Sequence, residues 1–414
     1  MTEPAPDQSA DTSAVCSGGK SGVPSAAASP PSLSDAAARS SPSSRTVQWT
    51  ALVLVTLLSL ALLAALAEGF VRVRQYLRSG SAVSQTTLYT DDARLQLRVL
   101  KPGMRSGPVS INASGFRGPE IETPKPPGRV RIAFLGASTT FCAEASSDAA
   151  VWPHLVVEQL RAAYPGTSFD YVNAAVPGYF VSSSRTNLKH RVAQHQPDII
   201  VIYHATNNLS RETRDLAIAE GLDDAAESGQ LNWLERHSLL WELVVKNLRV
   251  RRAQQQAAES AQADTLGRGS SRKLVIDPAR TGAQFQTDLR ALINESGAIA
   301  TRVAVATFAT RLRPEQTPQQ QREAAVSAFV YSPFMSVEGL LRGFARYNGI
   351  IREVAQAEGA LLIDGENAIP GDAVHFADTV HFTDAGSRKM AGRVATALKG
   401  DTRIAALAAA RRAP

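Results

Sequence analysis

Four short blocks of the sequence contain residue types that together can carry out nucleophilic acyl transfer. They are Gly136-Ala-Ser138, Asn173-Ala-Ala-Val-Pro-Gly178, Thr206-Asn207-Asn208 and Asp378-Thr-Val-His381. A serine hydroxyl is a poor nucleophile until a base takes its proton, and histidine has the pKa range for that task. A carboxylate then fixes the histidine tautomer and stabilises the imidazolium. Ser138, His381 and Asp378, three residues before this histidine, are candidates for the three groups.

The pattern of strands and helices brings these blocks to one edge of a predicted sheet. Strand-like runs fall at 131–136, 168–173, 198–204, 302–308 and 360–364. Amphipathic stretches fall at 151–164, 182–195, 336–358 and 384–398. Strands separated by helices predict a parallel sheet covered on both faces, whose carboxyl edge binds ligands. We therefore expect an α/β fold, a three-layer α/β/α sandwich with a central parallel sheet, preceded by one transmembrane helix.

In this order, the four blocks resemble the signature blocks of the SGNH hydrolases, also called GDSL esterases or lipases. The resemblance covers roughly residues 130–398 and implies a flavodoxin-like arrangement of the sheet. It implies a catalytic triad of Ser138, His381 and Asp378 that works through an acyl-serine, with no metal and no organic cofactor.

The resemblance also implies an oxyanion hole. Its donors would be the backbone N–H of the same serine, the backbone N–H of Gly178 and the side-chain amide of Asn207. Three residues depart from the family pattern, since Ala137, Ala205 and Asn208 stand where Asp, Gly and Asp are usual. The changes at Ala137 and Asn208 remove hydrogen-bonding carboxylates, and all three changes leave every role above filled.

Other interpretations of single residues stay open on the sequence alone. Ser138 is also a good helix N-cap. His375 is a second candidate base, although the Asp-x-x-His spacing favours His381. Asn208 can exchange roles with its neighbour, because both follow the same predicted strand. Residues 383–384 are expected to cap the last helix rather than to take part in chemistry.

The N-terminal part of the chain predicts a membrane anchor. Residues 1–45 are rich in Ser, Ala and Pro and are expected to be disordered. Thr46–Ala67 contains no charge, and as a helix it reaches about 33 Å, enough for an apolar bilayer core of about 30 Å. We predict a transmembrane helix over 46–70. Ala65-Leu-Ala67 also matches a signal-peptide cleavage site, but the leading polar segment is long and the apolar run exceeds the usual length.

The remaining segments are expected to surround the sheet. Residues 71–128 read as an extended, turn-rich connector, in which Asn112-Ala-Ser-Gly-Phe-Arg-Gly118 is predicted to form a turn packed against the first strand. This stretch is similar to the approach segment of some membrane-tethered relatives. The SGNH-like domain is expected over 129–400, with a helical insert at about 210–300, and a basic C-terminal tail over 401–414.

Two further segments are singled out by composition. Residues 246–273 carry seven Lys or Arg against two Asp or Glu, following Trp233 and Trp241. The composition of this basic stretch is typical of a solvated face of the insert or of a surface that binds anionic lipid or polysaccharide. Residues 312–333, with their Gln and Glu run, read as a mobile loop or lid near the carboxyl edge of the sheet.

Composition excludes several classes of function. The net charge of +6 is spread along the chain without a block typical of a nucleic-acid-binding arm. The first strand is not followed by Gly-x-Gly-x-x-Gly, which disfavours a dinucleotide site. The spacing of His190, His195 and His204 does not indicate a metal site.

We therefore predict a membrane-anchored, extracytoplasmic serine esterase that acts on acyl esters of envelope glycans or lipids. Arginines flank the apolar helix on both sides, so the positive-inside count does not decide the orientation. The substrate class rests on analogy with the family and on the expected extracytoplasmic location. An O-acyltransferase on the same scaffold and a catalytically inactive glycan- or protein-binding module are the alternatives.

Overall fold

A five-stranded parallel sheet lies at the centre of the computed structural model, with strand order β6-β5-β7-β8-β9. Its strands are β5 (Arg129–Gly136), β6 (Ser168–Asn173), β7 (Ile199–Tyr203), β8 (Arg302–Ala306) and β9 (Leu361–Ile363). Every residue of β7 is buried, as expected for a strand covered on both faces. The predicted strands are confirmed, and each end falls within two residues of its expected position.

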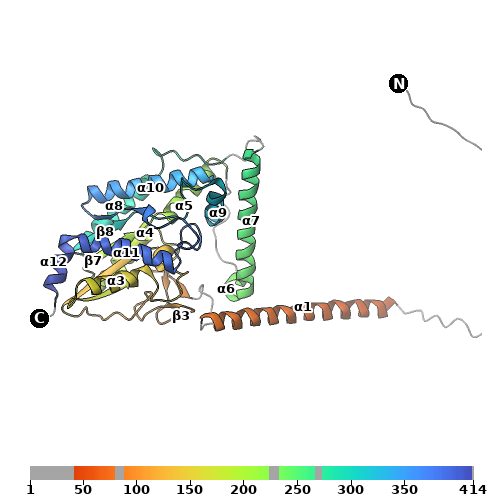
Figure 1. Ribbon diagram of the computed structural model, residues 1–414. Helices are drawn as coiled ribbons and strands as arrows, with labels where there is room; N and C mark the ends of the chain where they lie inside the picture. The colour runs from red at the N-terminus through yellow and green to blue at the C-terminus, as the bar shows by residue number, and fades with distance from the viewer. Residues whose placement is uncertain (1–41, 80–87, 223–232, 266–272, 413–414) are drawn as a thin grey trace, which may run out of the picture. The chain divides into compact units, whose positions relative to one another are not determined.

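Helices cover both faces of this sheet (Figure 1). One layer contains α3 (Trp152–Ala163), α11 (Asp384–Gly400) and α12 (Thr402–Ala410). The other contains α4 (Val181–Asn187), α5 (Thr206–Ala219), α8 (Ala283–Gly297) and α10 (Val337–Ala357). The π-helix η2 (Leu188–Val192) and the short 3₁₀ helix η3 (Ala193–His195) continue α4, and η4 (Glu366–Ala368) follows β9. The predicted three-layer α/β/α sandwich is therefore confirmed.

The structure describes residues 42–79, 88–222, 233–265 and 273–412, in two units, Met1–Ala61 and Leu62–Pro414. Residues 1–41 of the predicted disordered tail lie outside the described residues, and the tail's last four residues already belong to a helix. This helix is α1 (Pro42–Ser79). Its stretch Thr46–Leu77 is long and apolar enough to cross a membrane, and no residue in the most apolar part of this stretch is buried.

The connector predicted over 71–128 is more ordered than its composition suggests. It begins inside α1 and then forms two small antiparallel hairpins, β1 (Tyr89–Asp92) with β2 (Leu97–Leu100), and β3 (Arg105–Ser106) with β4 (Val109–Ser110). Apolar side chains of this segment form a small core with residues beside Ser138 and Gly178. This core contains Leu88, Leu100, Val109, Ile111, Ala137, Phe141, Ala175, Val176 and Tyr179.

Two other predicted segments differ from expectation. The insert predicted over 210–300 is shorter, because α5 at its start packs on α10, and Phe285 and Leu289 of α8 at its end lie in the main core. Within the predicted insert, the described helices that remain outside the layers are α6 (Trp233–His237) and α7 (Leu239–Thr265). Residues 402–410, predicted as part of a basic tail, instead form α12, whose Ile404 and Ala408 pack in the main core.

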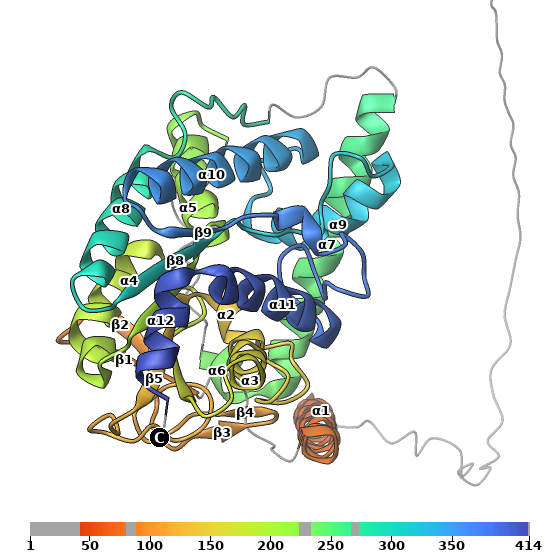
Figure 2. The ribbon, with the colours of Figure 1, turned by 60° about the vertical axis from the view of Figure 1, so that its left-hand side comes forward.

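Helix α7 contacts both the end of α1 after residue 62 and helix α9. At its beginning, the Glu68 carboxylate of α1 accepts hydrogen bonds from the backbone N–H groups of Leu239 and Leu240 and from the Ser238 hydroxyl. A carboxylate in this position satisfies N–H groups that the first helical turn leaves without partners. Helix α7 also packs against α9 (Pro318–Tyr331) (Figure 2).

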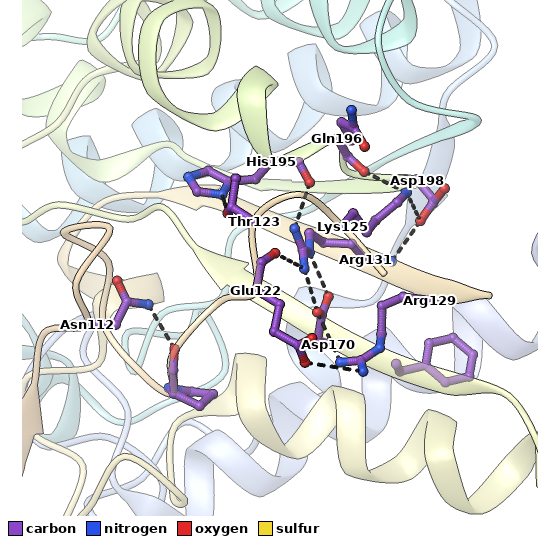
Figure 3. A network of polar contacts seen from close by, with 12 residues as sticks. Asn112, Glu122, Thr123, Lys125, Arg129, Arg131, Asp170, His195, Gln196 and Asp198 are labelled. Carbon is purple, nitrogen blue, oxygen red and sulfur yellow. Dashed lines mark hydrogen bonds and ion pairs between the residues drawn. The ribbon is translucent and has the colours of Figure 1, made fainter. Parts of the chain in front are cut away.

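A buried polar network closes the amino end of the sheet (Figure 3). The fully buried Arg131 guanidinium of β5 makes two hydrogen bonds to Asp170 of β6, of 2.7 and 2.8 Å. Its backbone N–H donates to Asp198, which also pairs with Lys125 at 2.8 Å. The pair of Lys125 with Asp198 attaches the connector to the sheet at the end opposite to the loops that carry the predicted site residues.

Candidate active site

Ser138 lies at the carboxyl end of β5, where the chain turns directly into the short helix α2 (Ser138–Phe141). The turn needs glycine at position 136, because a Cβ there would lie 2.6 Å from the Cβ of Thr140 and 3.0 Å from the carbonyl oxygen of Tyr203. As the first residue of the helix, Ser138 has a backbone N–H that meets no acceptor within the described part of the chain. Both its hydroxyl and this N–H are therefore available to a ligand.

His381 and Asp378 reach this serine from the loop that precedes α11. The Nε2 atom of His381 is 2.8 Å from the Ser138 hydroxyl oxygen, and its Nδ1 atom is 2.7 Å from the carboxylate of Asp378. The backbone N–H groups of Val380 and His381 both donate to the other carboxylate oxygen at 2.9 Å. The three residues predicted from the sequence thus form one hydrogen-bonded chain.

The electrostatics of this pair suit a histidine that accepts and returns a proton. Burial acts to lower the pKa of His381, but the hydrogen bond and negative charge of Asp378 outweigh it and hold that pKa above its ordinary value. Burial acts to raise the pKa of Asp378, whereas its bonds to His381 outweigh it and hold that pKa below the ordinary value. The carboxylate therefore stays ionised and stabilises a protonated imidazole.

Gly178 and Asn207 lie on the same pocket as Ser138. Gly178 has φ of +88°, a conformation that L side chains rarely adopt, and its backbone N–H meets no acceptor among the described residues. The side-chain amide of Asn207 donates one hydrogen bond to the Tyr179 carbonyl at 2.9 Å, and an amide nitrogen carries a second hydrogen. Asn208 points elsewhere: it is buried, and its oxygen accepts from the Val181 N–H. The geometry thus separates the two asparagines.

A cavity of about 520 Å³ opens beside these residues. Its apolar part is formed by Leu209, Met335, Leu340 and Phe344. Helix α9 contributes Ser327, Ala328 and Tyr331 to the wall, within the segment predicted to be a mobile lid. The prediction of a loop is wrong for residues 318–331, because Thr317 caps the helix in reciprocal hydrogen bonds with Gln320 and Pro318 occupies the first turn.

The alternative residues lie away from the cavity or are already engaged. His375 pairs with Asp372 at 2.8 Å and does not line the cavity. His204 is buried, bonds to the Ser184 hydroxyl, and has its pKa lowered by burial to about 3. Thr383 caps α11 as predicted, with its hydroxyl accepting from the Gly386 N–H.

Sequence reasoning missed the part played by Arg117. The predicted turn forms, with the Asn112 side chain accepting from the N–H groups of Ser114 and Phe116. From this turn the fully buried guanidinium of Arg117 donates to the carbonyls of Phe141 and Cys142, at the end of the helix that begins with Ser138. It also pairs with Asp148 at 2.8 Å. The Gly-Phe-Arg-Gly stretch was the signal, but it does not reveal what its arginine contacts.

A family model gives the chain its class. Residues 134–389 match the model of the GDSL-like lipase/acylhydrolase family, a span that contains Ser138, Gly178, Asn207, Asp378 and His381. The chain belongs to this family. The predicted resemblance is therefore confirmed, and this GDSL-family chain is a hydrolase that acts on ester bonds.

Solved structures similar to this GDSL-family chain include Axe2, an acetylxylan esterase from Geobacillus stearothermophilus, at 16% identity. That match covers 66% of this chain and 95% of the other, with a TM-score of 0.39. A lipase/acylhydrolase from Enterococcus faecalis matches at 17% identity over 66% of this chain and 96% of the other, with a TM-score of 0.38. No curated protein matches the sequence.

Proposed function

We propose that the chain is a serine esterase in which Ser138 attacks the ester carbonyl carbon. The observation that carries this proposal is the hydrogen-bonded chain from the Ser138 hydroxyl through His381 to Asp378, at 2.8 and 2.7 Å, on the wall of an open cavity. The resemblance to the family's signature blocks, which implies the same three residues as a catalytic triad, supports the proposal.

In the first half of the reaction, the Ser138 oxygen bonds to the carbonyl carbon while its proton passes to Nε2 of His381. The oxyanion of the tetrahedral intermediate accepts hydrogen bonds from the N–H groups of Ser138 and Gly178 and from the amide of Asn207. The carbon–oxygen bond to the alcohol then breaks, and the imidazolium, stabilised by Asp378, returns its proton to the leaving oxygen. An acyl-serine remains.

In the second half, His381 removes a proton from the molecule that attacks the acyl-serine. Attack by water completes hydrolysis, and attack by a carbohydrate hydroxyl completes an acyl transfer. The geometry of Ser138, His381 and Asp378 supports either outcome. The family assignment favours hydrolysis.

The proposed substrates are acyl esters on glycans or lipids of the cell envelope. This follows from the apolar stretch Thr46–Leu77, which we propose anchors the chain in a membrane with the esterase unit on the extracytoplasmic side. A reporter enzyme that is active on only one side of the membrane, fused to the C-terminus, tests the orientation. A cytoplasmic readout would contradict the envelope substrate.

The test of the nucleophile is covalent labelling of the detergent-solubilised full chain with a fluorophosphonate probe. We expect labelling of the parent and none of Ser138→Ala, with Ser146→Ala as a control because Ser146 instead bonds to Asp384. Equal labelling of the parent and Ser138→Ala, or no labelling of a folded parent, would favour an inactive binding module. Incubation with an acyl ester and a sugar acceptor, followed by mass spectrometry of the products, distinguishes hydrolysis from transfer.

A further inference from the structure

Two arginines on α5 border the cavity that contains Ser138. Arg211 and Arg214 lie one helical turn apart, and both line the same wall as Asn207 and Leu209. Arginines at the reaction cavity of an esterase have no part in the proton transfers proposed above, because their guanidinium groups stay charged at all relevant pH values. Arg211 can instead contribute to what the cavity binds.

The guanidinium of Arg211 is held in place without any of its donors being used. Its central carbon lies 3.9 Å from the centroid of the Phe180 ring, a stacking contact that leaves the in-plane N–H groups free. Phe180 follows the Gly178–Tyr179 turn, which carries a proposed oxyanion donor and also bonds to Asn207. Among the described residues, Arg211 has neither an ion-pair partner nor a hydrogen-bond acceptor, whereas most arginines on this unit have one.

Within the described part of the chain, no free carboxylate on the cavity wall compensates this cation. Asp378 is the one carboxylate among the described residues that line the cavity, and its oxygens are occupied by His381 and two backbone N–H groups. Helix α7, packed on α9 beside the cavity, adds Lys246, which acts to lower the pKa of His381, while Glu144 acts to raise it. The lining itself is therefore positively charged.

We propose that Arg211 binds an oxyanion group, a carboxylate or a phosphate, that the substrate carries beside its acyl ester. The substrate class is thus an acylated acidic glycan or an acylated phosphate-bearing compound, rather than a neutral ester. A planar guanidinium with free in-plane donors fits the two oxygens of such a group in parallel hydrogen bonds. This inference rests on the proposed function, because it places the anion next to the ester that Ser138 attacks.

The experiment compares three sugars that carry an acetyl group on the same hydroxyl: a neutral methyl glucoside, the corresponding glucuronoside and the corresponding glucoside phosphate. The readout is the ratio of kcat/KM for each anionic ester to that for the neutral ester, measured with the full chain in detergent. We expect the parent to prefer at least one anionic ester, and the charged ester that gains identifies a carboxylate or a phosphate as the natural group. The preference should decrease as ionic strength rises.

In Arg211→Gln we expect this ratio to fall by roughly 10- to 100-fold, the range for one charge-assisted hydrogen-bonded pair. Arg211→Lys should retain part of the preference, since an ammonium keeps the charge but not the paired donors. The matched control is Arg388→Gln, an exposed arginine on α11 that does not line the cavity, and its ratio should equal that of the parent. Melting temperatures report whether each variant is folded.

Two results would overturn the inference while leaving the proposed function standing: a parent that hydrolyses the neutral ester with no anionic preference, and a preference that persists in folded Arg211→Gln. Failure of the proposed function looks different. In that case the parent hydrolyses none of the three esters and the fluorophosphonate probe does not label it.

Discussion

Replacing Arg117 by methionine tests whether the segment before the sheet supports the proposed nucleophile. The Arg117 guanidinium donates to the carbonyls of Phe141 at 2.7 Å and Cys142 at 2.6 Å, both on buried residues at the end of the helix that begins with Ser138. It also lies 5.1 Å from the centroid of the Phe141 ring. Methionine fills much of the same volume but supplies no donor, so the variant removes the polar contacts and keeps much of the packing.

The expected loss of stability follows from these contacts. The Phe141 carbonyl, left without its donor, costs about 1–3 kcal/mol. The Cys142 carbonyl adds less, because it still accepts from the Ala145 backbone N–H at 3.1 Å. The partner Asp148 adds less, because its side chain is 25% exposed and it still accepts from the Ser110 N–H at 2.9 Å. We therefore expect Arg117→Met to lower the free energy of unfolding by about 2–4 kcal/mol, most of it from the Phe141 carbonyl and from the lost ion pair.

The kinetic consequence is separate from this loss of stability. Without its carbonyl anchors, the short helix no longer holds the Ser138 hydroxyl in one position, and a misplacement of about 1 Å costs on the order of 100-fold in rate. We expect kcat to fall by about 10- to 100-fold with a smaller change in KM, below the melting temperature of the variant. Arg117→Lys should recover part of kcat, because an ammonium can reach some of the same acceptors.

Urea unfolding and steady-state hydrolysis of a p-nitrophenyl ester measure the two effects. Arg105→Met is the matched control, since Arg105 is an exposed arginine of the same segment whose side chain bonds to Ser110, and its effect should stay within about 0.5 kcal/mol. An Arg117→Met variant with an unfolding free energy within about 1 kcal/mol of the parent and an unchanged kcat would refute the supporting role.

Three further predictions concern the proposed reaction directly. Asp378→Asn should lower kcat/KM by roughly 10⁴-fold. The parent should lose activity as pH falls through the raised pKa of His381, and this acidic limb of the pH profile should move to lower pH in the variant. An acidic limb that does not move would argue against the His381–Asp378 pair. In Gly178→Ala the new Cβ meets no atom within 4 Å, but a side chain at φ of +88° costs about 1–2 kcal/mol. We therefore expect a lower kcat without a steric clash. An unchanged kcat would argue against a role of Gly178 in binding the oxyanion. Asn207→Ala should lower kcat by roughly 10²- to 10³-fold. Asn208→Ala should mainly lower the melting temperature, because it leaves the Val181 N–H without an acceptor. The reverse pattern would exchange the roles of the two asparagines.

Local patterns predicted the parts of the fold that depend on burial along the chain. A parallel strand covered on both faces is a continuous apolar run, so Ile199–Tyr203 and its neighbours are recognisable without their partners. The hairpins between Tyr89 and Ser110 have strands of two to four residues, too short for a periodic pattern. Helix α9 differs from the predicted loop although Thr317, Pro318 and Gln320 form a helix-start signal, because its polar first half has no apolar periodicity typical of a helix.

The sequence by itself determined where the strands lie along the chain and which loop contains each reactive residue, because both depend on short stretches of neighbouring residues. Only the tertiary structure decided which of these residues meet. The bond between Ser138 and His381 joins positions 243 residues apart, and Asn207 differs from Asn208 only in the direction that the start of α5 gives each side chain. The burial of Arg117 likewise depends on carbonyls from a different segment. Contacts between distant segments depend on how the layers pack, which no local pattern of residues contains.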